Sequence, residues 1–369
     1  MALFDRNWKG IFTRWIPWSR IVRYLARKHG FLDPIALVGR LERFAQPSEV
    51  AEPIELLRAG AMFHARGLLN RKAIESNMDW VWPHWIVHQF DPDDVAFVPR
   101  AFSITQINLT HRNWTAVGMP NCEALPIVDP RGLVTPLHDQ WSVDVWIIPD
   151  QGRPLLPSEE GTAEQRFVVD RDPVAVETVT GRDGMRLTNT VQTQLVDDRP
   201  VCRLQVEART DRPAWLVVAV RPFNPEGISL INRIAVDADG RRWRVDGQGE
   251  VVFGEAPERV TLSAYADGDV YHHIPADSGV TAVDCHVGMA SAAGLYRLDA
   301  GGSRALHVDV PLTADPTARP LFPAAPAAAW DDVLAGSCRV QLPDDRIQHL
   351  FDAAMRTLVL HTPGDTYPG

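Results

Sequence analysis

The stretch that most restricts the fold of this chain runs from Trp215 to Gly227, with the sequence WLVVAVRPFNPEG. It opens with apolar, valine-rich residues and no charge, which predicts a strand buried on both faces. The run stops at Arg221, where prolines and a glycine follow, so we expect a rigid turn at one end of a sheet. Such a strand would deliver Arg221 and Asn224 to the edge of that sheet. For Arg221 alone, the simpler interpretation is that it satisfies loop carbonyls.

Residues 160–315 contain further segments with the pattern of β-strands. Short segments rich in β-branched and aromatic residues alternate with turns of Asp, Gly and Pro, at the spacing of an antiparallel sandwich. The segments are RFVVD, VAVETVT, MRLTNTVQTQLV, VCRLQVEAR, WLVVAVRP, ISLINRIAVD, RWRVDG, EVVFG, RVTLSAYA, GVTAVDCHVG, LYRLD and RALHVDVPL. We therefore predict a mainly β fold with a large antiparallel β-sandwich over residues 96–315.

Helical patterns flank the predicted sandwich on both sides. We expect residues 1–95 to form a helical extension, with the longest helical period from Pro53 to about Asn77. Residues 316–343 are rich in proline and alanine and indicate a linker. We expect a helix within residues 344–369 to begin at Asp344. Its apolar positions are Ile347, Leu350, Phe351, Ala354, Met355, Leu358 and Val359.

The N-terminal residues 6–28 are basic and aromatic. They contain seven basic side chains and no acidic one, with tryptophans at helical intervals, as an interfacial helix would have. One hypothesis is a scaffold anchored to an anionic membrane surface through this segment. The alternative, an apolar stripe that docks on its own domain, is the one we favour.

Charge and cysteine usage restrict the partners and the compartment. The net charge of -10 argues against nucleic acid as a partner, because phosphate binding needs a basic field. The four cysteines are far apart, no secretory signal is visible, and no stretch is long and apolar enough to span a membrane. We expect a soluble protein in the cytoplasm.

Tryptophans gather in the first part of the chain, since nine of the twelve precede residue 150. Aromatic faces beside carboxylates, amides and arginines suit carbohydrates, which stack on rings and pair their hydroxyls. A stand-alone carbohydrate-binding module with residues 80–146 as its platform is one possibility, and core-filling tryptophans are the other. The candidate substrate-binding residues are Trp82, Trp85, Asn113, Trp114, Asp129, Arg131, Trp141, Arg221 and Asn224.

The sequence gives weaker evidence for metal binding and for catalysis than for carbohydrate binding. His84 and His88 lie one helical turn apart, but no third ligand is near, and we favour core histidines, without a metal or another cofactor. The usual phosphate-binding, zinc-protease and nucleophile-elbow motifs are missing. Asp129, Asp139 and Asp144 are the candidates if the chain is catalytic by itself; the alternative is turn and solvent-face residues.

The order of parts resembles a known family. A large β-sandwich, a linker and the helix RIQHLFDAAMRTLVLHTPGDTYPG resemble the N-terminal half of six-hairpin, (α/α)6-barrel glycoside hydrolases, in particular glycogen-debranching-enzyme-like and glucoamylase-like proteins. The RPFN turn at Arg221–Asn224 and the loop at Thr366–Gly369 are similar to that family as well. The resemblance covers about residues 100–369, and residues 1–95 look like an addition.

The resemblance implies a function in carbohydrate metabolism. In that family the catalytic carboxylates lie in the helical barrel, so they would follow Gly369, and no catalytic residue is assigned here. We expect a non-catalytic N-terminal region of a hydrolase for an α-glucan or related glucoside, inactive alone, with a carbohydrate and the C-terminal helical barrel as its partners.

Overall fold

The computed structural model describes residues 53–88, 114–122, 124–137, 140–170, 172–225, 227–312 and 329–362. Contacts divide the chain into two compact units. One unit comprises Met1–Lys72 and Arg100–Ile107, and the other comprises Ala73–Pro99 and Asn108–Gly369. The basic segment 6–28 and the candidate residues Asn113 and Asp139 lie outside the described residues.

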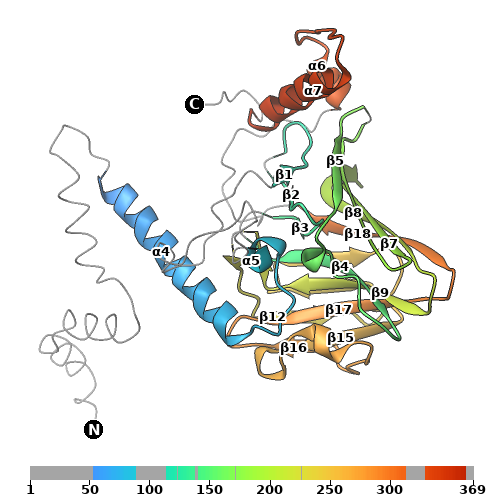
Figure 1. Cartoon of the computed structure of the whole chain (residues 1–369). Helices are drawn as coiled ribbons and strands as arrows, with labels where there is room; N and C mark the ends of the chain where they lie inside the picture. Colours follow the sequence, from blue (N-terminus) through green and yellow to red (C-terminus); the bar gives the residue numbers. More distant parts are fainter. Residues whose placement is uncertain are drawn as a thin grey trace, which may run out of the picture. The chain divides into compact units, whose positions relative to one another are not determined.

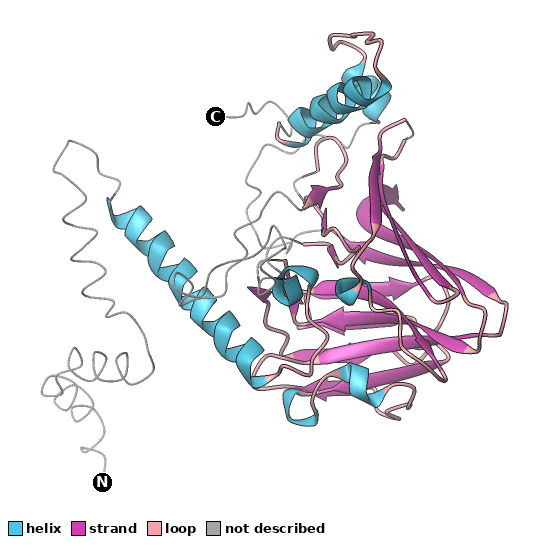
Figure 2. Cartoon of the chain, in the orientation of Figure 1, coloured by secondary structure: helices cyan, strands magenta, loops and turns pink. Residues whose placement is uncertain are grey.

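Two antiparallel sheets dominate the second unit (Figures 1 and 2). The seven-stranded sheet has the order β1-β2-β3-β4-β9-β17-β15. Its strands are β1 (Thr115–Ala116), β2 (Ile127–Val128), β3 (Val134–Thr135), β4 (Ser142–Pro149), β9 (Ala214–Arg221), β15 (Arg259–Ser263) and β17 (Ser291–Leu298).

The nine-stranded sheet has the order β16-β12-β13-β14-β18-β8-β7-β6-β5. Its strands are β5 (Glu164–Val168), β6 (Ala175–Arg182), β7 (Met185–Val196), β8 (Arg199–Arg209), β12 (Arg233–Val236), β13 (Arg242–Val245), β14 (Gly249–Phe253), β16 (Ala282–Asp284) and β18 (Ser303–Pro311). The predicted segments in residues 160–315 all carry strands, which confirms the mainly β, sandwich-like fold.

A short hairpin and seven helical segments complete the described structure. The hairpin pairs β10 (Phe223–Asn224) with β11 (Gly227–Ile228) directly after β9. The helical segments are α4 (Pro53–Ser76), α5 (His84–His88), η2 (Pro157–Glu159), η3 (Tyr265–Asp267), η4 (Val270–His273), α6 (Trp330–Leu334) and α7 (Asp345–Leu360). The helices predicted near residues 53–77 and after Asp344 are confirmed, and α6 lies within the predicted linker.

Strand β9 is buried along its whole length, as the charge-free run predicts. Leu216 and Val218 belong to the main core between the two sheets. Val217 and Ala219, on the opposite face of the strand, belong to a second apolar cluster with Val81. Because both faces of β9 are covered, alternation between polar and apolar residues is absent from its sequence.

Two hairpins connect the long strands of the nine-stranded sheet. Asp183 and Gly184 join β6 to β7, and Asp197 and Asp198 join β7 to β8. All four residues have positive φ, between 47° and 78°. Two-residue turns with positive φ match the twist of antiparallel strands, which explains why Asp and Gly stand there.

Helix α7 carries an apolar stripe that the rest of the described chain leaves exposed. Its N-cap is Asp344, whose carboxylate accepts hydrogen bonds from the amides of Arg346 and Ile347. Ile347, Leu350 and Leu358 are 54%, 66% and 53% exposed, and no residue of α7 is buried.

Among the described residues, no helix combines the length and apolar character that a transmembrane span requires.

Candidate functional site

Residues Asn77–Ile86, which we call the strap, lie across the outer face of the seven-stranded sheet. Trp80 and Trp82 stack with ring centroids 6.1 Å apart, and the Trp82 indole N–H donates to the Asn77 carbonyl at 2.8 Å. The Trp82 ring also packs against Phe223 of β10, at 5.5 Å between centroids. The aromatic residues of this segment therefore stabilise the strap itself and attach it to the β10–β11 hairpin.

A buried ion pair fixes the strap to the end of β9. Both terminal nitrogens of Arg221 donate to the carboxylate of Asp269, which is the N-cap of η4. The same two residues hold both ends of one peptide group: Asp269 Oδ2 accepts from the Val81 N–H at 2.8 Å, and Arg221 donates to the Val81 carbonyl at 3.1 Å. We call Arg221, Asp269 and Val81 the clamp.

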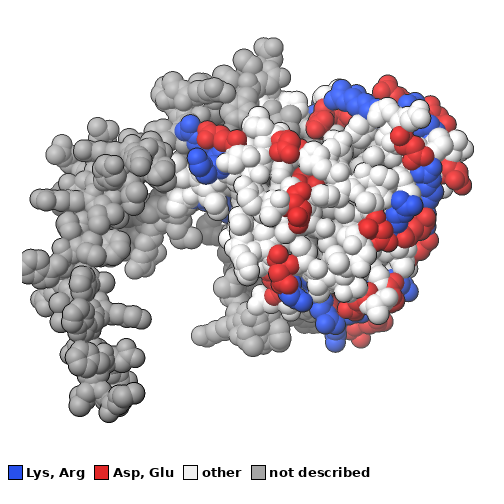
Figure 3. Space-filling view, turned by 90° about the horizontal axis from the view of Figure 1, so that it is seen from below, with Lys and Arg blue, Asp and Glu red and all other residues white. Residues whose placement is uncertain are grey.

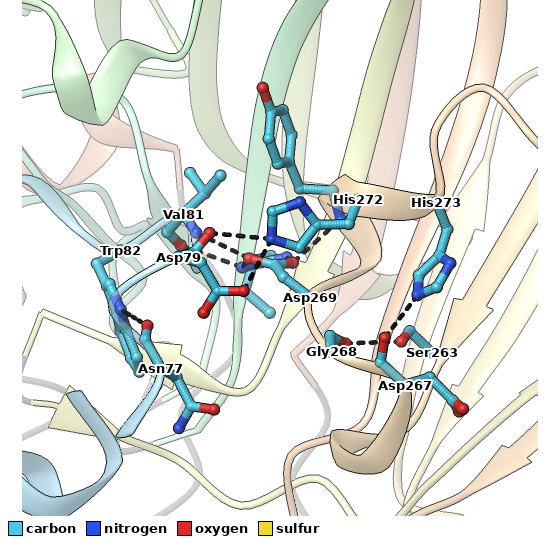
Figure 4. Close-up of polar contacts among 12 residues, drawn as sticks. Asn77, Asp79, Val81, Trp82, Ser263, Asp267, Gly268, Asp269, His272 and His273 are labelled. Atoms are coloured by element: carbon cyan, nitrogen blue, oxygen red, sulfur yellow. Dashed lines mark hydrogen bonds and ion pairs between the residues drawn. The ribbon is translucent and has the colours of Figure 1, made fainter. Parts of the chain in front are cut away.

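Figure 4 shows the strap side of the clamp, with Asp269 beside Val81 and with His272 next to Asp79. The ring nitrogen Nε2 of His272 lies 3.1 Å from the Asp79 carbonyl oxygen and 3.2 Å from its carboxylate. Unlike the clamp, this second attachment is exposed to solvent. The strap is thus held by one buried and one exposed polar contact to η4.

Aromatic rings surround the Arg221 guanidinium. Its central carbon lies 4.9 Å from the Phe223 ring centroid, 5.1 Å from that of Trp146 and 5.9 Å from that of Trp80. Cation–π attraction strengthens when the partners are desolvated, and here Arg221 and Asp269 have no exposed side-chain surface. A charge in this position needs its partner, because isolated charges are costly to bury.

Two further carboxyl groups lie buried near the clamp. Burial raises the pKa of Asp144, on β4, to about 6, although the nearby Arg221 charge opposes the shift. Burial likewise raises the pKa of Asp129, in the turn after β2, to about 7. Hydrogen bonds from the amides of Leu133 and Arg131 to Asp129 oppose that shift without cancelling it.

These carboxyl groups can hold a proton near neutral pH, which is a property that acid–base catalysts share. Access for a substrate is the other requirement. Only 2% of Asp129 and 6% of Asp144 are exposed, and Arg221 is committed to Asp269 and Val81. Within the described residues, Asp129, Asp144 and the clamp therefore form a buried polar cluster, which we call the brace. The brace can bind protons near neutral pH.

The remaining candidate residues around this brace make structural contacts. The Asn224 amide donates to the Gln140 carbonyl at 2.8 Å. The Arg131 guanidinium donates to the carbonyls of Glu160 and Gly161 at 3.1 and 3.0 Å. Asp129, Arg221 and Asn224 thus gather around β4 and β9, while the Arg131 side chain turns toward the loop after η2.

The candidate tryptophans divide among different surroundings. Trp82 and Trp85 are buried with the strap, and Trp141 is buried in the core between the sheets. Trp114 is half-buried. A ring buried on both sides offers no open face to a sugar, so the three buried rings have a packing role here. A part in carbohydrate binding stays a prediction for all the candidate residues.

The histidine pair sits in the short helix α5. The rings of His84 and His88 lie with centroids 3.9 Å apart, and His84 Nδ1 is 3.2 Å from the Ser158 carbonyl oxygen. Within the described part of the chain, no group of three or more His, Cys, Asp or Glu residues is arranged to hold a metal ion.

Sequence reasoning missed Asp269 and the strap peptide of Val81. The pattern Asp269-Val-Tyr-His-His contained a signal, since an aspartate before a short helix is a typical N-cap. The pairing with Arg221, across 48 residues, had no local signal at all.

On the face shown in Figure 3, basic and acidic residues lie close to one another, mainly toward the rim, and a large part of the described surface between them is uncharged. Several charged side chains of the described residues form ion pairs. Arg297 binds Asp150 at 2.6 Å, and Arg304 binds both Glu255 and Glu258 at 2.5 Å. This face of the described residues presents no large field of one sign.

Comparisons with known proteins find matches among solved structures but none by sequence. No family profile and no curated protein matches the sequence. Among solved structures, a bacterial glucoamylase complexed with acarbose is similar at 6% identity and a TM-score of 0.38, over 55% of this chain and 33% of that chain. This chain thus spans about a third of the length of that glucoamylase. A likeness this weak supports no argument about activity.

Proposed function

We propose that this chain is the non-catalytic β-sandwich region of a carbohydrate-active glycoside hydrolase that acts on an α-glucan or a related glucoside. The hydrolytic carboxylates would come from a helical barrel, of which α7 is the first helix. The resemblance of the sandwich, the RPFN turn and the last helix to six-hairpin glycosidases supports this assignment.

The observation that carries the proposal is the exposed stripe of α7. An amphipathic helix gains most of its stability by burying its apolar face against a partner. Ile347, Leu350 and Leu358 are spaced along one side of α7 and are all more than half exposed. A helical barrel packed on that side would bury this stripe.

The buried brace agrees with a supporting role for the sandwich. The polar residues that gather at the end of β9 lie beneath the strap, with little surface for a substrate. Arg221 would then fix the turn Pro222–Pro225, and with it the part of the sandwich that faces the barrel. Catalysis by the sandwich alone is not part of the proposal.

The test compares the 369-residue chain with the protein that its natural reading frame encodes. Release of glucose from maltooligosaccharides should require the longer protein. In that protein, Leu350→Asp with Leu358→Asp should abolish hydrolysis by detaching the helical domain. The matched control is Leu230→Asp, at a 52% exposed leucine of the sandwich, which should leave hydrolysis unchanged.

Two results would contradict the proposal. One is a reading frame that encodes no helical domain, and the other is a longer protein that hydrolyses no glucoside. Saturable binding of maltooligosaccharides by the 369-residue chain, with a change in tryptophan fluorescence, would favour a carbohydrate-binding module instead.

A further inference from the structure

Strand β5 (Glu164–Val168) is an edge of the nine-stranded sheet. It pairs with β6 on one side, and no described strand pairs with it on the other. In an antiparallel edge strand, alternate residues direct their backbone N–H and C=O groups away from the sheet. In the part of the chain that the structure describes, no strand takes up these groups.

A groove of about 490 Å³ runs along this edge, and helix α7 forms its other wall. The sheet side consists of Arg166–Asp170. Its apolar residues are Phe167, Val168 and Val169, which we call the apolar floor, and Phe167 also packs against the main core. The helix side consists of Asp345, Gln348, His349 and Asp352. A groove between an edge strand and a helix is the geometry in which extended peptides bind by strand addition.

The groove and the apolar stripe use opposite sides of α7. Residues 345, 348, 349 and 352 follow the spacing of one helical face, while Ile347, Leu350 and Leu358 occupy the face turned away from it. A partner packed on the apolar stripe, as the proposed function requires, would therefore leave the groove side of α7 available.

The charge of the groove selects the kind of occupant. Asp170, Asp345 and Asp352 contribute three carboxylates. Arg166 is the arginine among the lining residues, and its guanidinium already pairs with Glu177 of β6 at 3.0 Å. Electrostatic complementarity therefore favours a basic segment, with lysine or arginine side chains toward α7.

We propose that this groove binds an extended, basic segment of a partner polypeptide, which adds a strand to β5. Side chains of a strand alternate between its two faces, so a segment that alternates basic and apolar residues fits the acidic wall and the apolar floor. This inference goes beyond the proposed function and does not depend on it.

The probe is a fluorescein-labelled ten-residue peptide of alternating lysine and valine, measured by fluorescence polarisation with the 369-residue chain. Binding should saturate, and the peptide of alternating glutamate and valine should not bind. The double variant Asp345→Asn, Asp352→Asn should weaken binding by about tenfold or more. The charge-matched control Asp331→Asn, Asp332→Asn on α6 should bind as the wild type does.

Two further measurements separate strand addition from charge attraction alone. N-methylation of alternate peptide nitrogens should abolish binding in one of the two possible registers and spare the other. Equal binding of both methylated peptides, or of the acidic peptide, would overturn the proposal. Because Asp345 lies in the first turn of α7, Asp170→Asn on the opposite wall tests the charge requirement without touching that helix.

The peptide-binding groove and the proposed role in a glycoside hydrolase can be tested independently of each other. Leu350→Asp should not change binding of the lysine–valine peptide, since Leu350 lies on the far side of α7. Loss of peptide binding in that variant would contradict the assignment of the groove face, whatever the outcome of the glucoside assay.

Discussion

Arg221 and Asp269 form a buried, bidentate ion pair. The same pair binds the backbone of Val81, since Asp269 accepts from its N–H and Arg221 donates to its carbonyl. The pair joins the end of β9, the N-terminus of η4 and the strap. Removing either charge would leave the other in an environment with no water to replace it.

Arg221→Met should destabilise the chain by about 3–5 kcal/mol, because it leaves the Asp269 carboxylate buried without a partner. The measurement is the free energy of unfolding from denaturant titration. The matched control is Arg233→Met, which breaks the Arg233–Asp284 pair, where the side chains are 54% and 59% exposed. That change should cost about 0–1 kcal/mol. Equal effects of the two substitutions would show that the clamp contributes nothing beyond a surface pair.

Asp129→Asn should remove part of the pH dependence of stability. The pKa of Asp129 is raised to about 7 in the folded chain, so between its ordinary unfolded value and pH 7 the folded state binds more protons than the unfolded state. The free energy of unfolding therefore falls as the pH rises from about 4 to about 7. Asparagine keeps an oxygen for the Arg131 and Leu133 amides, so the variant should be more stable than the wild type at pH 8.

A control of opposite sign is Asp150→Asn. The hydrogen bond from Arg297 lowers the pKa of Asp150, so its contribution is present above the ordinary aspartate pKa and lost as the pH falls. This variant should leave the slope between pH 5 and pH 7 unchanged. If Asp129→Asn also leaves that slope unchanged, Asp129 is not the group that titrates there.

Leu350→Ala should change the stability of the 369-residue chain by less than about 0.5 kcal/mol, because the side chain is two-thirds exposed. Leu216→Ala, at a fully buried position of β9, should cost about 2–5 kcal/mol. Thermal unfolding of the two variants provides the comparison. A large loss for Leu350→Ala would mean that α7 already has a packing partner along that stripe.

Trp82→Ala should cost about 3–5 kcal/mol, since the ring fills the space between Trp80 and Phe223. Trp82→Phe keeps an aromatic ring and loses the hydrogen bond to the Asn77 carbonyl, and it should cost about 1 kcal/mol. Denaturant titration distinguishes the two. If both variants are as stable as the wild type, the strap is not held by this ring.

The local sequence predicted the elements of the sandwich well, because strand pattern and turn chemistry are short-range properties. The run MRLTNTVQTQLV coincides with β7, and the valine-rich run before Arg221 coincides with β9. Asp344, the expected start of the last helix, is the N-cap of α7.

The candidate site was predicted only in part. The proline-rich turn marked Arg221 and Asn224, but their partners come from distant segments: Asp269, Gln140 and Val81. Tryptophan content alone suggested a sugar platform as readily as a core. The structure shows that Trp82, Trp85 and Trp141 are buried, and burial depends on all the elements that pack around a ring.

By itself, the sequence determined where strands, turns and caps form, since period-2 patterns, Asp–Gly turns and N-caps depend on neighbouring residues. Only the tertiary structure decided that Arg221 binds Asp269 and the Val81 peptide, that Asp129 and Asp144 lie together in a low-dielectric region, and that β5 and α7 enclose a groove. The physical reason is that charge pairing, desolvation and groove shape depend on distances between residues that are far apart in the chain.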